Sequence, residues 1–200
     1  MSKISVLMSV YKKENPEYLR ASLESILVQT RTADEILLIE DGPLTQELYQ
    51  VVAEYQKKCD YLHVHAMEQN VQLGRALAKG VELCKYDLIA RMDTDDIAMP
   101  DRLEKEGAYM EAHPEVDVVG GAIREFNDEG TIDRVKNMPK TQEEILEYVK
   151  VRNPLNHMTV MYRKDSILKA GNYKHFPFLE DYSLWSRMLS PVSYTHLRAH

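Results

Sequence analysis

Four consecutive residues near the middle of the chain could bind a metal ion: Asp93-Thr94-Asp95-Asp96. Alternate side chains of an Asp-x-Asp segment can reach one point. Carboxylate oxygens suit Mg²⁺ or Mn²⁺, which usually take one or two of them together with substrate phosphates. A simpler interpretation is that Asp95, Asp96 and Asp101 are solvated residues that cap the helix expected next, because acidic residues favour helix N-termini. The cluster by itself leaves both interpretations open.

The first hundred residues alternate between short apolar runs and amphipathic segments. The runs predict buried strands, and apolar residues at i, i+3 or i+4 spacing predict helices between them. Asn15-Pro16 opens the first helix, with Asn as the cap and Pro in the first turn. The expected strands cover residues 4–10, 35–39, 62–66 and 88–92. This alternation predicts βαβ units in a parallel sheet with right-handed crossovers.

Polar side chains follow the end of each expected strand. In the order of the strands they are Tyr11, Glu40 with Asp41, Asn70, and Asp93 with Asp95. The ligand crevice of such a sheet lies beyond the carboxyl ends of its strands. We therefore expect the active site at this edge.

The second half of the sequence has a less regular pattern. It predicts helices over 100–112, 141–149, 166–170 and 180–189, a strand pair over 116–126 that is broken at Gly120-Gly121, a turn over 127–130 and a strand over 158–162. The helix at 141 opens with a capping box, Thr141-Gln142-Glu143-Glu144.

Composition excludes several classes of protein. A net charge of -7 argues against a nucleic-acid binder, which would carry a basic stripe. The two cysteines, Cys59 and Cys84, lie outside any zinc-binding spacing and fit a reducing cytoplasm. We expect no signal peptide and no membrane-spanning segment in the chain as given, although it could touch a membrane.

Other phosphate-binding and catalytic motifs do not match. There is no Walker-type G-x-x-x-x-G-K-[ST], no G-x-G-x-x-G after the first strand and no G-x-S-x-G elbow. An EF-hand loop starting at Asp93 would place Ile97 at a ligand position and Ala98 where the turn needs glycine.

Six segments, in order, carry a resemblance to a known family. They are residues 5–11 (SVLMSVY), 40–42 (EDG), 70–80 with Asn70 and Gly74-Arg75-Ala76-Leu77-Ala78-Lys79-Gly80, 89–96 (IARMDTDD), 156–163 (NHMTVMYR) and 180–185 (EDYSLW). Together they resemble a family 2 glycosyltransferase of the GT-A fold, over residues 3 to 189. The resemblance implies a Rossmann-like three-layer α/β/α sandwich around a mostly parallel sheet.

The resemblance also implies a division of the chain. Residues 1–190 would form a single domain, in which 1–99 bind the nucleotide sugar and 100–190, cut short at the C-terminal end, bind the acceptor. Residues 191–200 match no family element and show neither a helical nor a strand period, so we expect an out-of-pattern tail.

For the donor, the resemblance assigns nucleobase and ribose binding to Tyr11 and Asp41, with Glu14 as a possible helper. Tyr11 could instead pack under the sheet edge. Asp93 would lie near the ribose or diphosphate and share the metal, Mn²⁺ or Mg²⁺, with Asp95. Asp96 would only cap the following helix.

For the acceptor, the resemblance assigns the catalytic base to Asp181, beside Glu180 in the substrate site. A carboxylate within hydrogen-bond reach can take the proton of the attacking hydroxyl. The alternative is that both acids cap the last helix. His157 is either an acceptor contact or a core histidine, and Arg91 meets either a phosphate or a partner in the sheet.

The implied reaction is a single inverting displacement by a hydroxyl of a saccharide or lipid-linked acceptor on a nucleotide-diphosphate sugar. The implied setting is bacterial surface polysaccharide assembly, in the cytoplasm or at the inner face of the membrane. Two alternatives are a sugar-phosphate nucleotidyltransferase and a non-catalytic nucleotide-sugar-binding fragment. The first should carry a Gly-rich basic loop after the first strand, where this chain has Tyr11-Lys12-Lys13-Glu14-Asn15.

Overall fold

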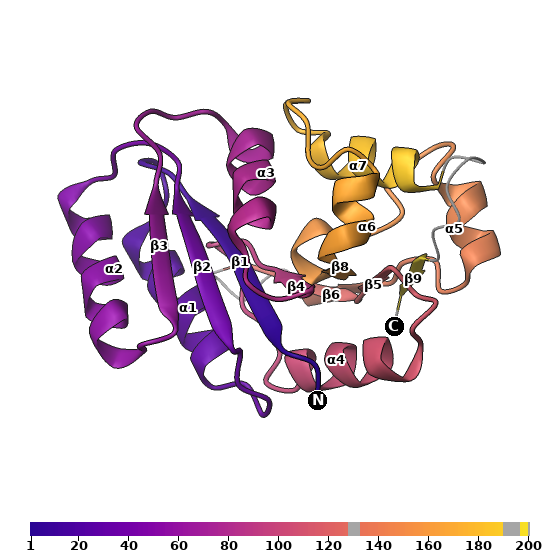
Figure 1. Cartoon of the computed structure of the whole chain (residues 1–200), viewed down its shortest axis with the longest axis horizontal. Helices are drawn as coiled ribbons and strands as arrows, with labels where there is room; N and C mark the ends of the chain where they lie inside the picture. The colour runs from indigo at the N-terminus through magenta and orange to yellow at the C-terminus, as the bar shows by residue number, and fades with distance from the viewer. Residues whose placement is uncertain (128–132, 190–196, 200) are drawn as a thin grey trace.

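A seven-stranded sheet forms the centre of the protein in a computed structural model that describes residues 1–127, 133–189 and 197–199 (Figure 1). From one edge to the other the strands are β3 (Leu62–Ala66), β2 (Glu35–Glu40), β1 (Ile4–Val10), β4 (Leu88–Arg91), β8 (Met161–Arg163), β5 (Val118–Gly120) and β9 (Leu197–Ala199). Neighbouring strands from β3 to β4 are parallel, and β8 runs antiparallel to both β4 and β5. The mostly parallel sheet is therefore confirmed.

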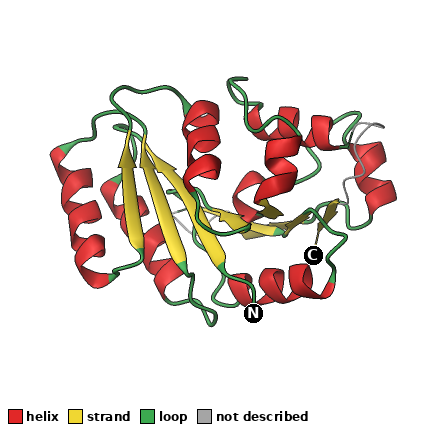
Figure 2. Ribbon diagram, viewed as in Figure 1, coloured by secondary structure: helices red, strands yellow, loops and turns green. Residues whose placement is uncertain are grey.

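Helices cover both faces of this sheet (Figure 2). They are α1 (Pro16–Leu27), α2 (Gln46–Lys58), α3 (Leu73–Leu83), α4 (Arg102–Ala112), α5 (Gln142–Tyr148), α6 (Lys164–Lys169) and α7 (Glu180–Met188). One apolar core joins the sheet to α1, α2 and α4, and a second joins its other face to α3, α5, α6 and α7. This is the three-layer α/β/α sandwich that the resemblance implied.

Local sequence explains where several elements begin and why the strands are apolar. All six residues of β2 are buried, because helices cover the sheet on both sides. The Asn15 side chain accepts a hydrogen bond from the Glu17 N–H at 2.9 Å and caps α1, with Pro16 in its first turn. The predicted capping box of Thr141 and Glu144 is present at the start of α5.

The strands in the second half of the chain differ from those that the sequence predicted. The expected pair over 116–126 belongs to two sheets, because after β5 the chain leaves the central sheet and β6 (Ile123–Phe126) pairs with β7 (Asp133–Lys136). The break falls at Gly121, whose N–H donates to Thr159 Oγ1 at 2.9 Å instead of continuing the ladder. The strand expected over 158–162 begins as a 3₁₀ turn, η1 (His157–Thr159), followed by β8.

Two predicted features lie partly outside the described residues. Of the turn expected over 127–130, only Asn127 is described. In the tail, β9 adds to the sheet edge beside β5, whereas the sequence pattern indicated no regular element there. Among the described residues, no helix combines the length and apolar character that crossing a membrane requires.

Candidate active site

The carboxyl ends of β1, β2 and β4 meet at one edge of the sheet, as the sequence predicted (Figure 1). The Asp41 N–H donates to Val10 O at 2.8 Å, which ties the end of β2 to that of β1. Thr94 Oγ1 donates to Glu14 Oε2 at 2.6 Å, which ties the acidic cluster to the segment after β1. Tyr11 is exposed at this edge, so it does not pack beneath it.

A cavity of about 360 Å³ opens beside Asp41. It is lined by Lys12, Asp41, Gly42, Pro43, Glu68, Gln69 and Asn70. The chain comes close to itself here, since Gly42 has φ +83° and a Cβ on it would lie 2.5 Å from Asn70 N. The sequence analysis identified Asp41 and Asn70 as site residues. It missed Lys12, Glu68 and Gln69, whose only signal in the sequence was that they lie close to the end of a strand.

The Asp41 carboxylate is buried in the wall of this cavity. Its Oδ2 accepts from Asn70 Nδ2 at 2.9 Å and its Oδ1 accepts from the Val71 N–H at 2.6 Å. Burial raises the pKa of Asp41, against the lowering effect of the Val71 and Gln72 N–H groups. An oriented carboxylate in such a cavity can accept hydrogen bonds from ligand hydroxyl groups.

The first aspartate of the acidic cluster, Asp93, is paired with Arg91. Arg91 is fully buried and donates to the Asp93 carboxylate and to Met92 O. Burial raises the pKa of Asp93, but the charge and hydrogen bond of Arg91, together with the charges of His157 and Arg102, outweigh it, and the net direction is downward. Arg91 was expected to meet either a phosphate or a partner in the sheet, and the structure shows it in an ion pair with Asp93.

The other two aspartates lie in different environments. Asp95 is exposed, whereas Asp96 is half-buried, and burial followed by the charges of Asp93 and Asp95 raises the pKa of Asp96 to about 6. The prediction that Asp96 caps a helix is wrong, because α4 begins six residues later with Asp101 as its N-cap. Asp101 forms no side-chain cap either and pairs with Lys105 at 2.6 Å.

The acidic cluster does not by itself supply a full set of ligands for a divalent cation. Within the described part of the chain, no three His, Cys, Asp or Glu side chains are grouped to hold a metal ion. The charges of Asp93 and Asp95 nevertheless raise the pKa of Asp96, and Mg²⁺ or Mn²⁺ needs only one or two carboxylates when phosphates and water complete its shell. The residues fit a metal that arrives with a phosphate-bearing ligand.

The start of α7 supplies the acids on the acceptor side. The Asp181 carboxylate accepts from Asn153 Nδ2 and from the Tyr182 N–H, the latter at 2.7 Å, so it is held in one orientation. Glu180 is buried against the start of α3, where a Cβ on Gly74 would lie 2.8 Å from its Cγ. Asn153 lies in an irregular stretch, and no sequence signal indicated it.

His157 lies close to both the acidic cluster and the start of α7. Its Nε2 lies 3.0 Å from Tyr173 Oη, in a hydrogen bond whose direction depends on the tautomer. Burial, then the charge of Arg91, lowers the pKa of His157 to about 4, although Asp181 and Asp93 act in the opposite direction. The imidazole is therefore neutral near pH 7, and both acids lie close enough to influence it.

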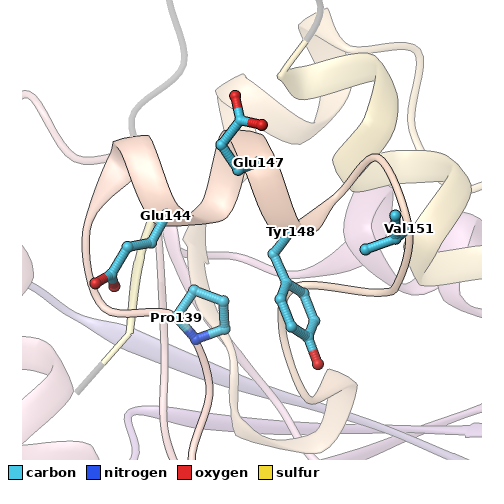
Figure 3. Close-up of a pocket in the computed structure, with 5 residues that line it drawn as sticks. All are labelled: Pro139, Glu144, Glu147, Tyr148 and Val151. Atoms are coloured by element: carbon cyan, nitrogen blue, oxygen red, sulfur yellow. The ribbon is translucent and has the colours of Figure 1, made fainter.

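A second cavity, of about 540 Å³, lies on the α5 side of the protein and contains none of the predicted site residues (Figure 3). Pro139, Glu144, Glu147, Tyr148 and Val151 line it. The potential active site is therefore the sheet edge, where the polar groups converge.

Comparisons with known proteins identify the family of the chain. Residues 5–174 match the family model described as glycosyl transferase family 2. The chain is 45% identical over 186 residues to the amylovoran biosynthesis glycosyltransferase AmsE of Erwinia amylovora, covering 93% of this chain and 69% of AmsE. It is 35% identical over 194 residues to an Escherichia coli UDP-Gal:alpha-D-GlcNAc-diphosphoundecaprenol beta-1,3-galactosyltransferase, covering 94% of this chain and 68% of that protein.

A solved structure shows the same fold. S. aureus TarS 1-349 in complex with UDP-GlcNAc superposes with a TM-score of 0.75 at 18% sequence identity. The match covers 99% of this chain and 56% of TarS 1-349, so the chain spans just over half of that solved chain. The structural neighbours have the GT-A fold, and this chain shares it. With the family model matching most of its length, the chain belongs to glycosyl transferase family 2.

Proposed function

We propose that the chain transfers a sugar from a nucleotide-diphosphate sugar to a hydroxyl group of a saccharide or lipid-linked acceptor, with inversion at the anomeric carbon, during assembly of a bacterial surface polysaccharide. The observation that carries the proposal is the arrangement at the sheet edge. The Asp41 cavity and the acidic cluster follow strands that end at this edge, and the charges of Asp93 and Asp181 both raise the pKa of His157.

The relatives support the donor and acceptor classes. AmsE is named for amylovoran biosynthesis, and the E. coli relative is named for a UDP-sugar and a diphosphoundecaprenol-linked acceptor. TarS has been solved with UDP and with UDP-GlcNAc. We extend these classes to the present chain as part of the proposal, without choosing among nucleotides or sugars.

On the donor side, Asp41 would accept hydrogen bonds from ribose hydroxyls, and exposed Tyr11 offers a ring for the base to stack on. Glu14 would hold the segment after β1 in place through its bond with Thr94. Asp95, together with Asp93, would hold Mn²⁺ or Mg²⁺, which when bound stabilises negative charge on the diphosphate.

On the acceptor side, the Asp181 carboxylate would take the hydroxyl proton as that oxygen bonds to the anomeric carbon. The bond from that carbon to the diphosphate breaks, and its electron pair leaves with the nucleoside diphosphate. Asn153 and the Tyr182 N–H orient the base. Arg91 would act through Asp93, and Glu180 by positioning the start of α7.

The proposal is tested first by calorimetry with a panel of nucleotide sugars, with and without Mn²⁺, and then by a transfer assay with saccharide and lipid-linked acceptors. Metal-dependent binding of one donor followed by transfer is expected. Binding without transfer to any acceptor would favour the nucleotide-sugar-binding fragment. Release of pyrophosphate from a sugar phosphate and a nucleoside triphosphate would favour a nucleotidyltransferase.

The metal role of Asp95 gives a sharper test. Asp95→Asn is expected to lower metal-dependent transfer by at least about a hundredfold, because a cation typically supplies several kcal/mol at a developing charge. Asp101→Asn is the matched control, since Asp101 is a partly exposed aspartate of the same segment but pairs with Lys105. Wild-type activity of Asp95→Asn in the presence of chelator would contradict the metal assignment.

A further inference from the structure

The loop that leads into α7 exposes apolar side chains next to the proposed base. All six residues from Lys174 to Leu179 are exposed, while Tyr173 before them and Glu180 after them are buried. The exposed fractions are 49% for Phe176, 95% for Phe178 and 53% for Leu179. Two of the chain's three phenylalanines therefore point outward within this 174–179 loop.

The backbone of this loop is fixed although its side chains are exposed. The Leu179 N–H donates to Phe176 O at 2.8 Å and closes a four-residue turn. Within it, Pro177 stands at the second position and Phe178, with φ +67°, at the third. This is the pattern of a type II turn, whose third position favours Gly or Asn over a bulky residue. Phe178 is thus held in a strained conformation without burying its ring.

The loop is also anchored on both sides. A Cβ on Gly74 would lie 2.4 Å from Lys174 O, so the loop packs tightly against the start of α3. At the other end, the Ser183 N–H donates to Leu179 O at 2.8 Å in the first turn of α7. In Figure 1 the loop projects from the top of the molecule, on the side where β1, β2 and β3 end. The apolar tip and Asp181 consequently belong to one segment that is anchored at both ends.

Such a tip suits the boundary between lipid headgroups and acyl chains. Phenylalanine and leucine side chains are stabilised by burial there, and exposed apolar side chains grouped on one loop mark a contact surface. The loop contains Lys174 and His175 but no acidic residue, in a chain whose net charge is -7. An acidic protein gains little from attraction to anionic lipids, so the contact must be mainly apolar.

We propose that the 174–179 loop inserts Phe176, Phe178 and Leu179 into a lipid bilayer surface and so presents Asp181 to acceptors that are linked to membrane lipid. The acceptor part of this inference rests on the proposed function, in which a lipid-linked acceptor is one option. The lipid contact itself does not depend on it.

The test is flotation of the full chain with vesicles of phosphatidylethanolamine and phosphatidylglycerol. The wild type should float, and raising NaCl from about 0.1 to about 0.5 M should change the bound fraction little, because the contact is apolar. Phe178→Asn should lower the partition coefficient by about tenfold, since one buried phenylalanine side chain contributes at least that factor. Asn tolerates the positive φ, so the turn is kept. Phe176→Ser should act in the same direction.

The matched control is Phe126→Asn, because Phe126 is the third phenylalanine of the chain and is also exposed, at 57%, but lies on β6. Its flotation should equal that of the wild type. A wild type that stays in solution, or equal losses in Phe126→Asn and Phe178→Asn, would overturn the inference. So would concentration-dependent self-association that Phe178→Asn abolishes while flotation is unchanged, which would assign the loop to a second copy of the chain.

Flotation requires neither donor nor acceptor, so its outcome is separate from that of the proposed function. If the chain floats through the loop but transfers no sugar, the lipid contact stands and the transferase proposal fails. If it transfers sugar to both water-soluble and lipid-linked acceptors without floating, the transferase proposal stands and the lipid contact fails. If both are correct, Phe178→Asn should raise KM for a lipid-linked acceptor in vesicles and leave KM for a short water-soluble analogue unchanged.

Discussion

The three aspartates after β4 stand within four positions, yet their surroundings differ. Asp93 is paired with Arg91, Asp95 is exposed, and the pKa of Asp96 is raised to about 6 by burial and by its two neighbours. Spacing alone could identify the group as a site for a cation. It could not assign roles within the group, because those depend on which side chains of other elements lie beside each carboxylate.

At the residue scale, Asp181 gives a prediction that separates catalysis from binding. Asp181→Asn keeps the size of the side chain and can still bond with Asn153 and Tyr182, but an amide cannot take the acceptor proton. We expect turnover to fall by about a hundredfold or more and the affinity for the donor to stay within about twofold. Initial rates and calorimetry measure the two quantities. Unchanged turnover would remove Asp181 as the base.

At the scale of elements, the β2–α2 connection depends on Gly42. Its φ of +83° disfavours any side chain, and a Cβ would lie 2.5 Å from Asn70 N. Gly42→Ala should therefore cost about 1–3 kcal/mol of unfolding free energy and weaken donor binding at the Asp41 cavity. Urea unfolding and calorimetry measure both effects.

Gly121→Ala is the matched control for this change. A Cβ on Gly121 would meet its nearest neighbour, Thr159 Cβ, at 3.6 Å, which is ordinary contact. Its unfolding free energy should stay within about 0.5 kcal/mol of the wild type. Equal losses in both variants would show that the close approach at Gly42 has no special importance.

The helix α4 gives a prediction about pH. Burial raises the pKa of Glu106 to about 7, although Arg102, one turn away on the same helix, lowers it. The folded protein then binds this proton more tightly than the unfolded chain, whose glutamate titrates near 4.5. The contribution of Glu106 to stability is thus fully present below pH 4.5 and is lost as pH rises through about 7.

Glu106→Gln isolates this contribution, because a glutamine does not titrate. The unfolding free energy of the variant relative to the wild type should rise with pH between about 4.5 and 7, by up to about 3 kcal/mol. Urea unfolding of both proteins at pH 5, 6, 7 and 8 measures the difference. A difference that is constant with pH, or that falls, would contradict the assignment.

At the scale of the whole molecule, the reversed strand β8 completes the site. Because β8 runs antiparallel to β4, the residues before it lie at the carboxyl end of β4, and the Arg91 N–H donates to Val160 O at 2.8 Å. This places His157 beside the acidic cluster and links the two halves of the chain. One family model matches residues 5–174 and so extends across both halves. The division into a nucleotide-sugar-binding half and an acceptor half therefore stays a prediction about function.

The sequence by itself determined the αβ alternation, the mostly parallel sheet and the convergence of Asp41 and Asp93 at one edge. These depend on local periodicity, on caps such as Asn15 and Thr141, and on the rule that parallel strands end on the same side. The resemblance added Asp181 and its proposed role. Such features can be predicted because each depends on neighbouring residues or on strand direction alone.

Only the tertiary structure decided the pairing within the site. It shows Arg91 in an ion pair with Asp93, and it excludes a helix-capping role for Asp96. It also brought Asn153 to Asp181 and Tyr173 to His157, and it left Phe178 exposed in a strained turn. These outcomes depend on contacts between residues far apart in the chain, which are fixed by how β8, α7 and α3 pack and have no signal in local periodicity.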